Sequence, residues 1–434
     1  MRGAVWILGS FISAILFLSA AVPVIARISF KDVAKEAGIR FILDNSATPE
    51  KHQIETMIGG VAVFDYDNNG RPDIYFLNGA RLPGMDKSDP KYWNRLYRND
   101  GNGKFTDVTE AAGVKGSGYG MGVAVGDYDN DGFEDIYIAG VTQNQLLHNN
   151  GDGTFTDVTA KAGLSGVFPK SGKKPLAVGA GWFDYNNDGL LDLFVVNYLQ
   201  WSIEHEAVCN NRNIRAYCSP DSYAGQPNML FRNNGDGTFT DVSESSGIAK
   251  YIGKGMGVAF ADYDGDGYED VFVSNDTYRN FLFHNKGNGT FEEAGVVNGI
   301  AYNENGKSIA GMGADFRDID NDGKPDIFVT GMTNDTFPLF RNAGDGFNDI
   351  TSSSGVAAAT GRLTGWSNGI FDFDNDGWKD LFTANSAILD NSEQIDGLPY
   401  LLPDLVLRNL GNSHFGNVSA GTAWAHPAAL HSRI

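Results

Sequence analysis

The sequence predicts an all-β fold, a β-propeller of four-stranded blades, on three observations. A nine-residue acidic loop occurs six times, beginning at residues 65, 127, 184, 262, 318 and 372. Each loop runs into a β-branched and aromatic segment, and each such segment is followed by a hairpin with a Gly-rich turn. Successive loops begin 54 to 78 residues apart, and four antiparallel strands repeated at such intervals are typical of propeller blades.

The N-terminal residues 1–26 indicate a secretory signal peptide. Arg2 is followed by an uncharged apolar run, with small residues before a cut ahead of Arg27. The run is also long enough to span a bilayer, so an uncleaved N-terminal anchor is the alternative and the only expected link to a membrane. Either interpretation places the protein outside the cytoplasm, as a secreted, periplasmic or cell-surface protein.

The next segment, FKDV (30–33), matches the fourth strand of the repeats, for example FTDV (105–108). A complete repeat has a Gly-rich first strand before the loop, a second strand after it, a third such as NQLLHN (144–149), and this fourth strand. One N-terminal strand plus six repeats predicts a seven-bladed type of propeller with six full blades and an incomplete seventh. Residues 27–434 are then one C-terminally truncated propeller, whose N-terminal strand completes a blade begun by the C-terminus. A closed six-bladed ring with that strand outside it is the alternative.

The loop 262–270, DYDGDGYED, shows why a metal ion is expected. Carboxylates stand at positions 1, 3, 5 and 9 and Gly at position 6, and so many carboxylates repel one another unless a cation lies between them. Oxygen ligands around a Gly turn favour Ca²⁺. An EF-hand is excluded, because position 12 is Val273 and the residues that follow the loop predict a strand. Position 7 is expected to bind through its backbone carbonyl.

Six Ca²⁺ sites are therefore predicted, with ligands at positions 1, 3, 5, 7 and 9 of each loop. In chain order these are Asp65, Asp67, Asn69, Arg71, Asp73, Asp127, Asp129, Asp131, Phe133, Asp135, Asp184, Asn186, Asp188, Leu190, Asp192, Asp262, Asp264, Asp266, Tyr268, Asp270, Asp318, Asp320, Asp322, Lys324, Asp326, Asp372, Asp374, Asp376, Trp378 and Asp380.

The net charge of −21 is largely that of the loops, which hold 22 acidic ligands, and this acidity excludes nucleic acid as a partner. The two cysteines, Cys209 and Cys218, lie in one insertion, 198–226, between predicted second and third strands. Too few other ligands lie nearby for a metal site, so a disulfide is predicted for an exported protein.

The remaining polar residues do not form a catalytic constellation, so no enzymatic activity is expected. His148 and His284 occupy a repeat position where other copies have Arg, which favours a structural role over a catalytic or zinc pair. Glu204 and Glu206 in the Cys insertion are interpreted as a solvated loop, with sugar or cation binding as the alternative. No nucleophile elbow, P-loop or dinucleotide motif occurs.

The sequence resembles the FG-GAP and VCBS calcium-binding repeats of integrin-α-like propellers, and more specifically the cartilage-acidic-protein-like, ASPIC/UnbV-associated family. The segments that carry the resemblance are FTDVTEAAGV, GMGVAVGDYDNDGFEDIYIAG, NMLFRNNGDGTFTDVS and the Cys insertion. The resemblance implies extracellular calcium binding and adhesion or ligand recognition, with a protein or glycan as ligand. A propeller enzyme acting on polysaccharide and a structural module of a secreted assembly are the alternatives.

Overall fold

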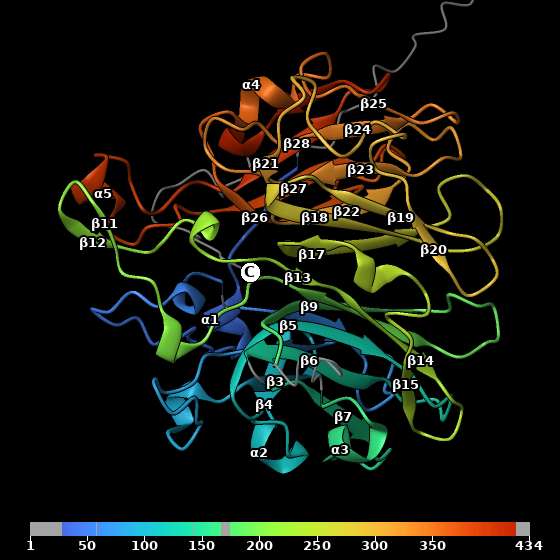
Figure 1. Ribbon diagram of the computed structural model, residues 1–434. Coiled ribbons are helices and arrows are strands. Elements are labelled where there is room, and N and C mark those ends of the chain that lie inside the picture. Colours follow the sequence, from blue (N-terminus) through green and yellow to red (C-terminus); the bar gives the residue numbers. More distant parts are fainter. Residues whose placement is uncertain (1–27, 58, 142, 166–173, 422–434) are drawn as a thin grey trace, which may run out of the picture.

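The computed structural model describes residues 28–57, 59–141, 143–165 and 174–421 and contains six four-stranded antiparallel blades arranged as a β-propeller (Figure 1). The predicted signal peptide or anchor, residues 1–26, lies outside the described residues. Within them, no helix has the length and apolar character needed to cross a membrane.

Each blade begins with its innermost strand and proceeds outward in chain order. Blades 1 to 3 are β1 (Val61–Phe64), β2 (Asp73–Phe76), β3 (Arg95–Gly101), β4 (Lys104–Asp107); β5 (Tyr119–Gly126), β6 (Asp135–Val141), β7 (Gln145–Asn149), β8 (Phe155–Asp157); and β9 (Ala177–Phe183), β10 (Asp192–Asn197), β14 (Met229–Asn233), β15 (Phe239–Asp241). Blades 4 to 6 are β17 (Gly255–Ala261), β18 (Asp270–Tyr278), β19 (Phe281–Asn285), β20 (Phe291–Glu293); β22 (Ala314–Arg317), β23 (Asp326–Val329), β24 (Leu339–Asn342), β25 (Phe347–Asp349); and β26 (Gly365–Phe371), β27 (Asp380–Asn385), β28 (Leu405–Asn409), β29 (Phe415–Asn417).

Short elements lie before the first blade, between the blades and within the long connections of single blades. They are α1 (Ala34–Ala37), α2 (Thr109–Ala112), α3 (Thr159–Ala162), α4 (Val356–Thr360), α5 (Ser392–Ile395), the strands β11 (Cys209–Asn211), β12 (Ile214–Ala216), β13 (Gln226–Pro227), β16 (Ile252–Gly253) and β21 (Ile309–Ala310), and the 3-10 turns η1 (Gln53–Thr56), η2 (Pro90–Tyr92), η3 (Ile203–His205), η4 (Pro220–Ser222), η5 (Ile248–Lys250) and η6 (Ser419–Gly421).

The hydrophobic core lies between neighbouring blades, because alternate residues of a strand point to opposite faces of its sheet. On β6, Ile136 and Ile138 pack against blade 1, whereas Tyr137 and Ala139 pack against blade 3. Similar apolar layers join blades 3 to 4, 4 to 5 and 5 to 6. The middle strands are buried on both faces, so their sequences are apolar throughout and do not alternate between apolar and polar residues.

The disc has two faces. The acidic loops join the first and second strands of the blades and form the loop face. The three long connections between second and third strands (β2–β3, β10–β14 and β27–β28) lie at the opposite ends of these strands and form the insertion face. The connections from blades 3 and 6 meet there, where β11, β12 and α5 lie together (Figure 1): Asn391 Nδ2 donates to the Arg215 carbonyl at 2.8 Å, and Arg212 Nη1 to the Ile395 carbonyl at 2.6 Å.

The N-terminal segment lies between blades 6 and 1. The ring centroids of Phe30 and Phe373 are 5.5 Å apart. This contact is like the one between successive blades 4 and 5, where the Tyr263 and Phe347 ring centroids are 5.8 Å apart. Gly38 packs against the carbonyl of Phe105, where a Cβ would come within 2.7 Å of the oxygen. The equivalent glycines after the fourth strands of blades 1 to 5 meet the same carbonyl of the next blade. The segment thus takes the outermost place of a seventh position, as the sequence predicts.

One part of that prediction is wrong: residues 28–33 form no strand, and α1 follows them directly. The physical reason is that a strand needs a hydrogen-bonded neighbour, and none pairs with these residues in the described part of the chain. The two innermost strands beside the seventh position accordingly expose apolar side chains, with Val63 of β1 61% and Phe371 of β26 48% exposed.

Candidate metal centre

The six acidic loops share one backbone conformation that their sequence explains. Position 4 has a positive φ in every loop and is Asn in five of them, and position 6, always Gly, also has a positive φ. In loop 127–135, for example, φ is 57° at Asn130 and 92° at Gly132. Only Gly, and to a lesser degree Asn, adopts this region without strain, so the chain can curl around its own carboxylates.

The first carboxylate organises each loop. In loop 127–135, Asp127 Oδ1 accepts from the Asp131 amide at 3.0 Å and Oδ2 accepts from the Gly132 amide at 2.9 Å. The same pair of bonds occurs in all six loops. The side chain at position 5 also accepts from the amide of position 7 in every loop.

The position-9 aspartates, Asp73, Asp135, Asp192, Asp270, Asp326 and Asp380, are fully buried at the start of the second strands. Each accepts a hydrogen bond from the backbone amide of the Asn that ends the third strand. Burial raises the pKa of these carboxyls, to about 6 in Asp73 and Asp380 and to about 7 in Asp192 and Asp326. A nearby cation would favour their ionised form and lower the pKa again.

The carboxylates converge as a metal site requires. In loops 65–73 and 127–135, oxygens of positions 1, 3 and 9 lie within 4.8 Å of one another, and in loop 262–270 oxygens of positions 1, 3 and 5 do so. Three position-3 oxygens, Oδ1 of Asp67, Asp320 and Asp374, are buried and have no hydrogen-bond partner among the described residues. Buried carboxylate oxygens without donors are costly, and a hard cation would satisfy them. The residues present therefore fit Ca²⁺.

Position 7 is predicted to bind the ion through its backbone carbonyl, and the structure shows a separate role for its side chain. The ring of Phe133 covers Gly151 in the third-strand hairpin, and the ring of Tyr268 covers Gly287 in the same way. These contacts explain why position 7 varies in type but is often large. Whether the position-7 carbonyls bind an ion stays a prediction.

The third strand contributes a side chain that the sequence analysis placed only in a structural role. Arg408 pairs with Asp374 at 2.6 Å and also contacts Asp376, and Arg341 pairs with Asp320 and Asp322. In two loops a His stands here instead: His148 Nδ1 lies 3.1 Å from Asp135, and His284 Nδ1 3.2 Å from Asp270. In four of the six loops this position therefore places a basic side chain or an imidazole against the predicted ligands.

Two further asparagines were missed, although both recur in the sequence. Position-4 Asn donates to the position-6 carbonyl of the next loop, as Asn68 does to Gly132 at 2.7 Å. The other is the Asn that ends the third strand in blades 2 to 6, whose side chain donates to the position-2 carbonyl of the preceding blade, as Asn409 does to Ile319 at 2.9 Å. The recurrence of Asn two residues before the position-6 Gly, and of RN or HN at the third strand, was the available signal, but the partners are remote in sequence.

The Cys insertion is held by a disulfide and by buried hydrogen bonds. Cys209 and Cys218 are bonded, with an S–S distance of 2.06 Å, across the β11–β12 hairpin. Glu206 is not the solvated residue that was predicted: its side chain is 9% exposed and accepts from Trp201 Nε1 at 2.6 Å and from the Gln53 amide at 3.3 Å. It has this role because η1 and the insertion fold against each other. Glu204 is exposed, as expected.

Comparisons with known proteins agree with this architecture. The family model of the FG-GAP-like repeat matches residues 65–138, 130–195, 217–273, 262–329 and 318–383. The chain is similar to cartilage acidic protein 1 of Xenopus tropicalis, 27% identical over 400 residues that cover 86% of this chain and 56% of the relative. It is also similar to cartilage acidic protein 1 of Homo sapiens, 26% identical over 344 residues that cover 75% of this chain and 47% of the relative. The chain thus spans about half the length of the curated relatives it matches.

Among solved structures, a similar chain comes from an Agrocybe aegerita lectin described as recognising non-reducing terminal N-acetylglucosamine. The TM-score is 0.48 and the identity 16%, with 84% of this chain and 80% of that chain covered.

Proposed function

This chain belongs to the FG-GAP-like repeat family, and from that premise we propose that it is an exported calcium-binding propeller that recognises an extracellular protein or glycan. The observation that carries the calcium part is the buried, unpartnered Oδ1 of Asp374, in a side chain that is only 1% exposed. An oxygen so placed gains most from a cation that it can contact directly.

Calcium would act here on stability. Extracellular Ca²⁺ modules bind with Kd values of about 10⁻⁴ to 10⁻³ M. At ~1 mM Ca²⁺ and a Kd of ~10⁻⁴ M, one site stabilises the folded state by about 1.4 kcal/mol through mass action. Six independent sites would contribute about 8 kcal/mol, comparable with the free energy of unfolding of a typical domain. Recognition would then fall to the insertion face, which carries the long connections.

Terbium luminescence tests the metal sites directly. Tb³⁺ replaces Ca²⁺ at oxygen sites, and Trp378 at position 7 of loop 372–380 is placed to sensitise it. We expect sensitised emission that Ca²⁺ displaces and that Trp378→Phe reduces. Trp93→Phe, in the β2–β3 connection on the insertion face, is the matched control and should leave the emission unchanged. Absence of Ca²⁺-sensitive emission, together with the same melting temperature in Ca²⁺ and in EDTA, would refute the calcium part.

The recognition part needs a separate experiment. A glycan and protein array probed in Ca²⁺ and in EDTA should show binding that is lost when calcium is removed. Release of reducing sugar from a bound polysaccharide would instead support the enzyme alternative.

A further inference from the structure

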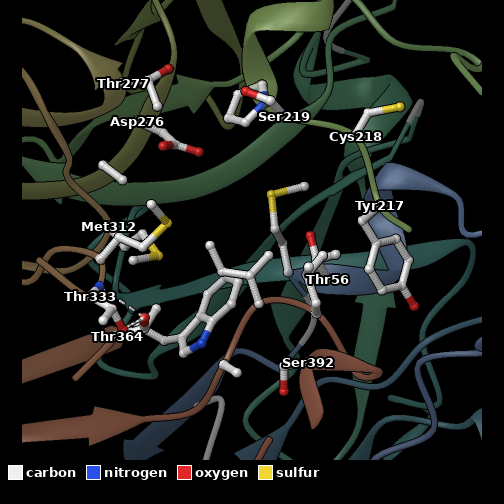
Figure 2. Close-up of a pocket in the computed structure, with 18 of the residues that line it drawn as sticks. Thr56, Tyr217, Cys218, Ser219, Asp276, Thr277, Met312, Thr333, Thr364 and Ser392 are labelled. Atoms are coloured by element: carbon white, nitrogen blue, oxygen red, sulfur yellow. Dashed lines mark hydrogen bonds between the residues drawn. The ribbon is translucent and has the colours of Figure 1, made fainter. Parts of the chain in front are cut away.

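A cavity of about 470 Å³ opens on the insertion face, and its lining residues are drawn in Figure 2. It lies over the propeller axis, because it shares residues with the channel that the innermost strands line. Its size lies in the range of small-molecule sites. Met256 and Trp366, each the second residue of an innermost strand, line both this cavity and the axial channel beneath it, as does Met312, two residues before the innermost strand β22. The connections from blades 3 and 6 form its upper walls, and their mutual hydrogen bonds hold these walls in place.

The walls of the cavity are mainly apolar, and flexible methionine side chains form much of them. Four of the eight methionines of the chain, Met57, Met256, Met312 and Met332, line it together with Trp366. Thioether side chains are flexible and polarizable, and they pack well against aliphatic and aromatic groups. Such a lining favours a ligand with an apolar body.

One ionisable group is buried in this apolar surrounding. Figure 2 shows the Asp276 carboxylate directed into the cavity from β18, and the residue is only 9% exposed. Tyr198 donates its hydroxyl to Asp276 Oδ2 at 2.5 Å. The other oxygen, Oδ1, has no hydrogen-bond partner in the part of the chain that the structure describes. Burial raises the pKa of Asp276 to about 6, against the lowering effects of the Tyr198 hydrogen bond and the Lys254 charge, so near neutral pH it is an anion.

The cavity supplies no cation for this carboxylate. No Lys, Arg or His is among the described residues that line it. The nearest basic side chain, Lys254, is already paired with Asp221 at 2.8 Å and lies against Thr277. The other carboxylate of the lining, Asp396, adds negative charge at the rim, 3.7 Å from Arg212.

A second buried polar atom of the lining is also a hydrogen-bond acceptor. Gln53 is 3% exposed, lines the cavity, and has a buried Oε1 without a hydrogen-bond partner among the described residues. The hydroxyls of Thr333 and Thr364, by contrast, bond to each other at 2.9 Å (Figure 2). A ligand that donates hydrogen bonds would therefore satisfy groups that the protein leaves free.

We propose that this cavity binds an organic cation, a primary ammonium or guanidinium head on an apolar body, with the head at Asp276 and the body against the methionines and Trp366. A charge-assisted hydrogen bond in a partly desolvated site stabilises such a complex, and burial of the apolar body against the methionines and Trp366 adds to it. The inference deepens the proposed recognition role of the insertion face, and it does not depend on calcium. Free amines and the Lys or Arg side chains of a protein share this chemistry.

Titration calorimetry with three six-carbon probes tests the proposal. Hexylamine should bind, whereas hexanol and hexanoate should bind at least about ten-fold more weakly, because only hexylamine carries the positive charge. Nα-acetyl-lysine methylamide and butylguanidine identify the source. If they bind as tightly as hexylamine, protein side chains fit the site; if only hexylamine binds, the site is specific for small free amines. Equal binding of hexylamine and hexanoate overturns the proposal.

Variants locate the binding within the cavity. Asp276→Asn keeps the shape and should weaken hexylamine at least about ten-fold. Asp396→Asn is the matched control at the rim and should change affinity by less than about three-fold, since that carboxylate is more exposed. Unchanged affinity in Asp276→Asn overturns the proposal, provided that its unfolding transition shows a folded protein.

The pH dependence of hexylamine affinity gives a second readout, which a purely structural role of Asp276 would not produce. The groups around Asp276 are Tyr198, Lys254, Asp221 and Asp335, and none of them titrates between pH 5 and 8 in its ordinary state. Hexylamine affinity should therefore fall as the pH drops below about 6, and this fall should disappear in Asp276→Asn. Terbium emission measured on the same samples reports the loop face separately, so failure at the cavity is distinguishable from failure of the calcium sites.

Discussion

Removing the side chain of Asn409 should cost more stability than removing that of Asn99, although the two residues occupy the same repeat position. Both accept from a hairpin glycine, Gly411 or Gly101, at 3.0 and 2.9 Å. Both also donate to a carbonyl of their own loop, Lys379 or Pro72, at 3.0 Å. Asn409 makes one further bond, to the Ile319 carbonyl of blade 5. Asn99 has no equivalent bond to another blade within the described residues.

The magnitude follows from these bonds. A neutral hydrogen bond contributes about 0.5–1.5 kcal/mol net, and a buried carbonyl left without its donor costs about 1–3 kcal/mol. Asn409 is 1% exposed, whereas Asn99 is only partly buried. We therefore expect Asn409→Ala to lower the free energy of unfolding by about 3 kcal/mol and Asn99→Ala by about 1 kcal/mol.

Urea unfolding in saturating Ca²⁺ measures this difference. An unchanged m-value would show that the variants expose the same amount of surface on unfolding. Asn233→Ala, which loses a bond of 2.7 Å to the Tyr128 carbonyl, should behave like Asn409→Ala. If Asn99→Ala costs as much as either, the bond between blades adds nothing, and the asparagines act only within their own blades.

Three further predictions concern the loops, the disulfide and the cavity. Loops 65–73 and 184–192, in which Asn69 and Asn186 replace a carboxylate, should bind Ca²⁺ most weakly; titration of variants that retain a single intact loop would show it, and tightest binding there would contradict the charge argument. Replacing Cys209 and Cys218 by Ser should lower the free energy of unfolding by about 2–3 kcal/mol at most, because the bond closes a short loop, and mass spectrometry with and without reductant checks the bond itself. The raised pKa of Asp276, about 6, means that the folded state holds its proton more tightly than the unfolded state. Its contribution to stability is therefore greatest below pH ~4 and falls as the pH rises to 6, by about 3 kcal/mol, and Asp276→Asn should abolish this part of the pH dependence of urea unfolding.

The sequence by itself determined the blade count and the strand order. Loop positions such as Asp127 and Gly132 recur at fixed spacing, and the middle strands are apolar throughout because both faces are buried. Local chemistry dictates these features: a Gly at position 6 permits the turn, and carboxylates spaced by two residues meet within one loop. Such contacts are close in the chain, so their residues can be identified without knowing the fold.

Only the tertiary structure decided which residues meet across blades and over the axis. Asn409 and Ile319 are 90 residues apart, and Tyr198 and Asp276 are 78 apart. Their pairing depends on the angle at which each blade packs on the next, and no local spacing encodes that angle. For the same reason residues 28–33 match a strand in sequence but form none: a strand is completed by its neighbour's backbone, and the local sequence does not supply that neighbour.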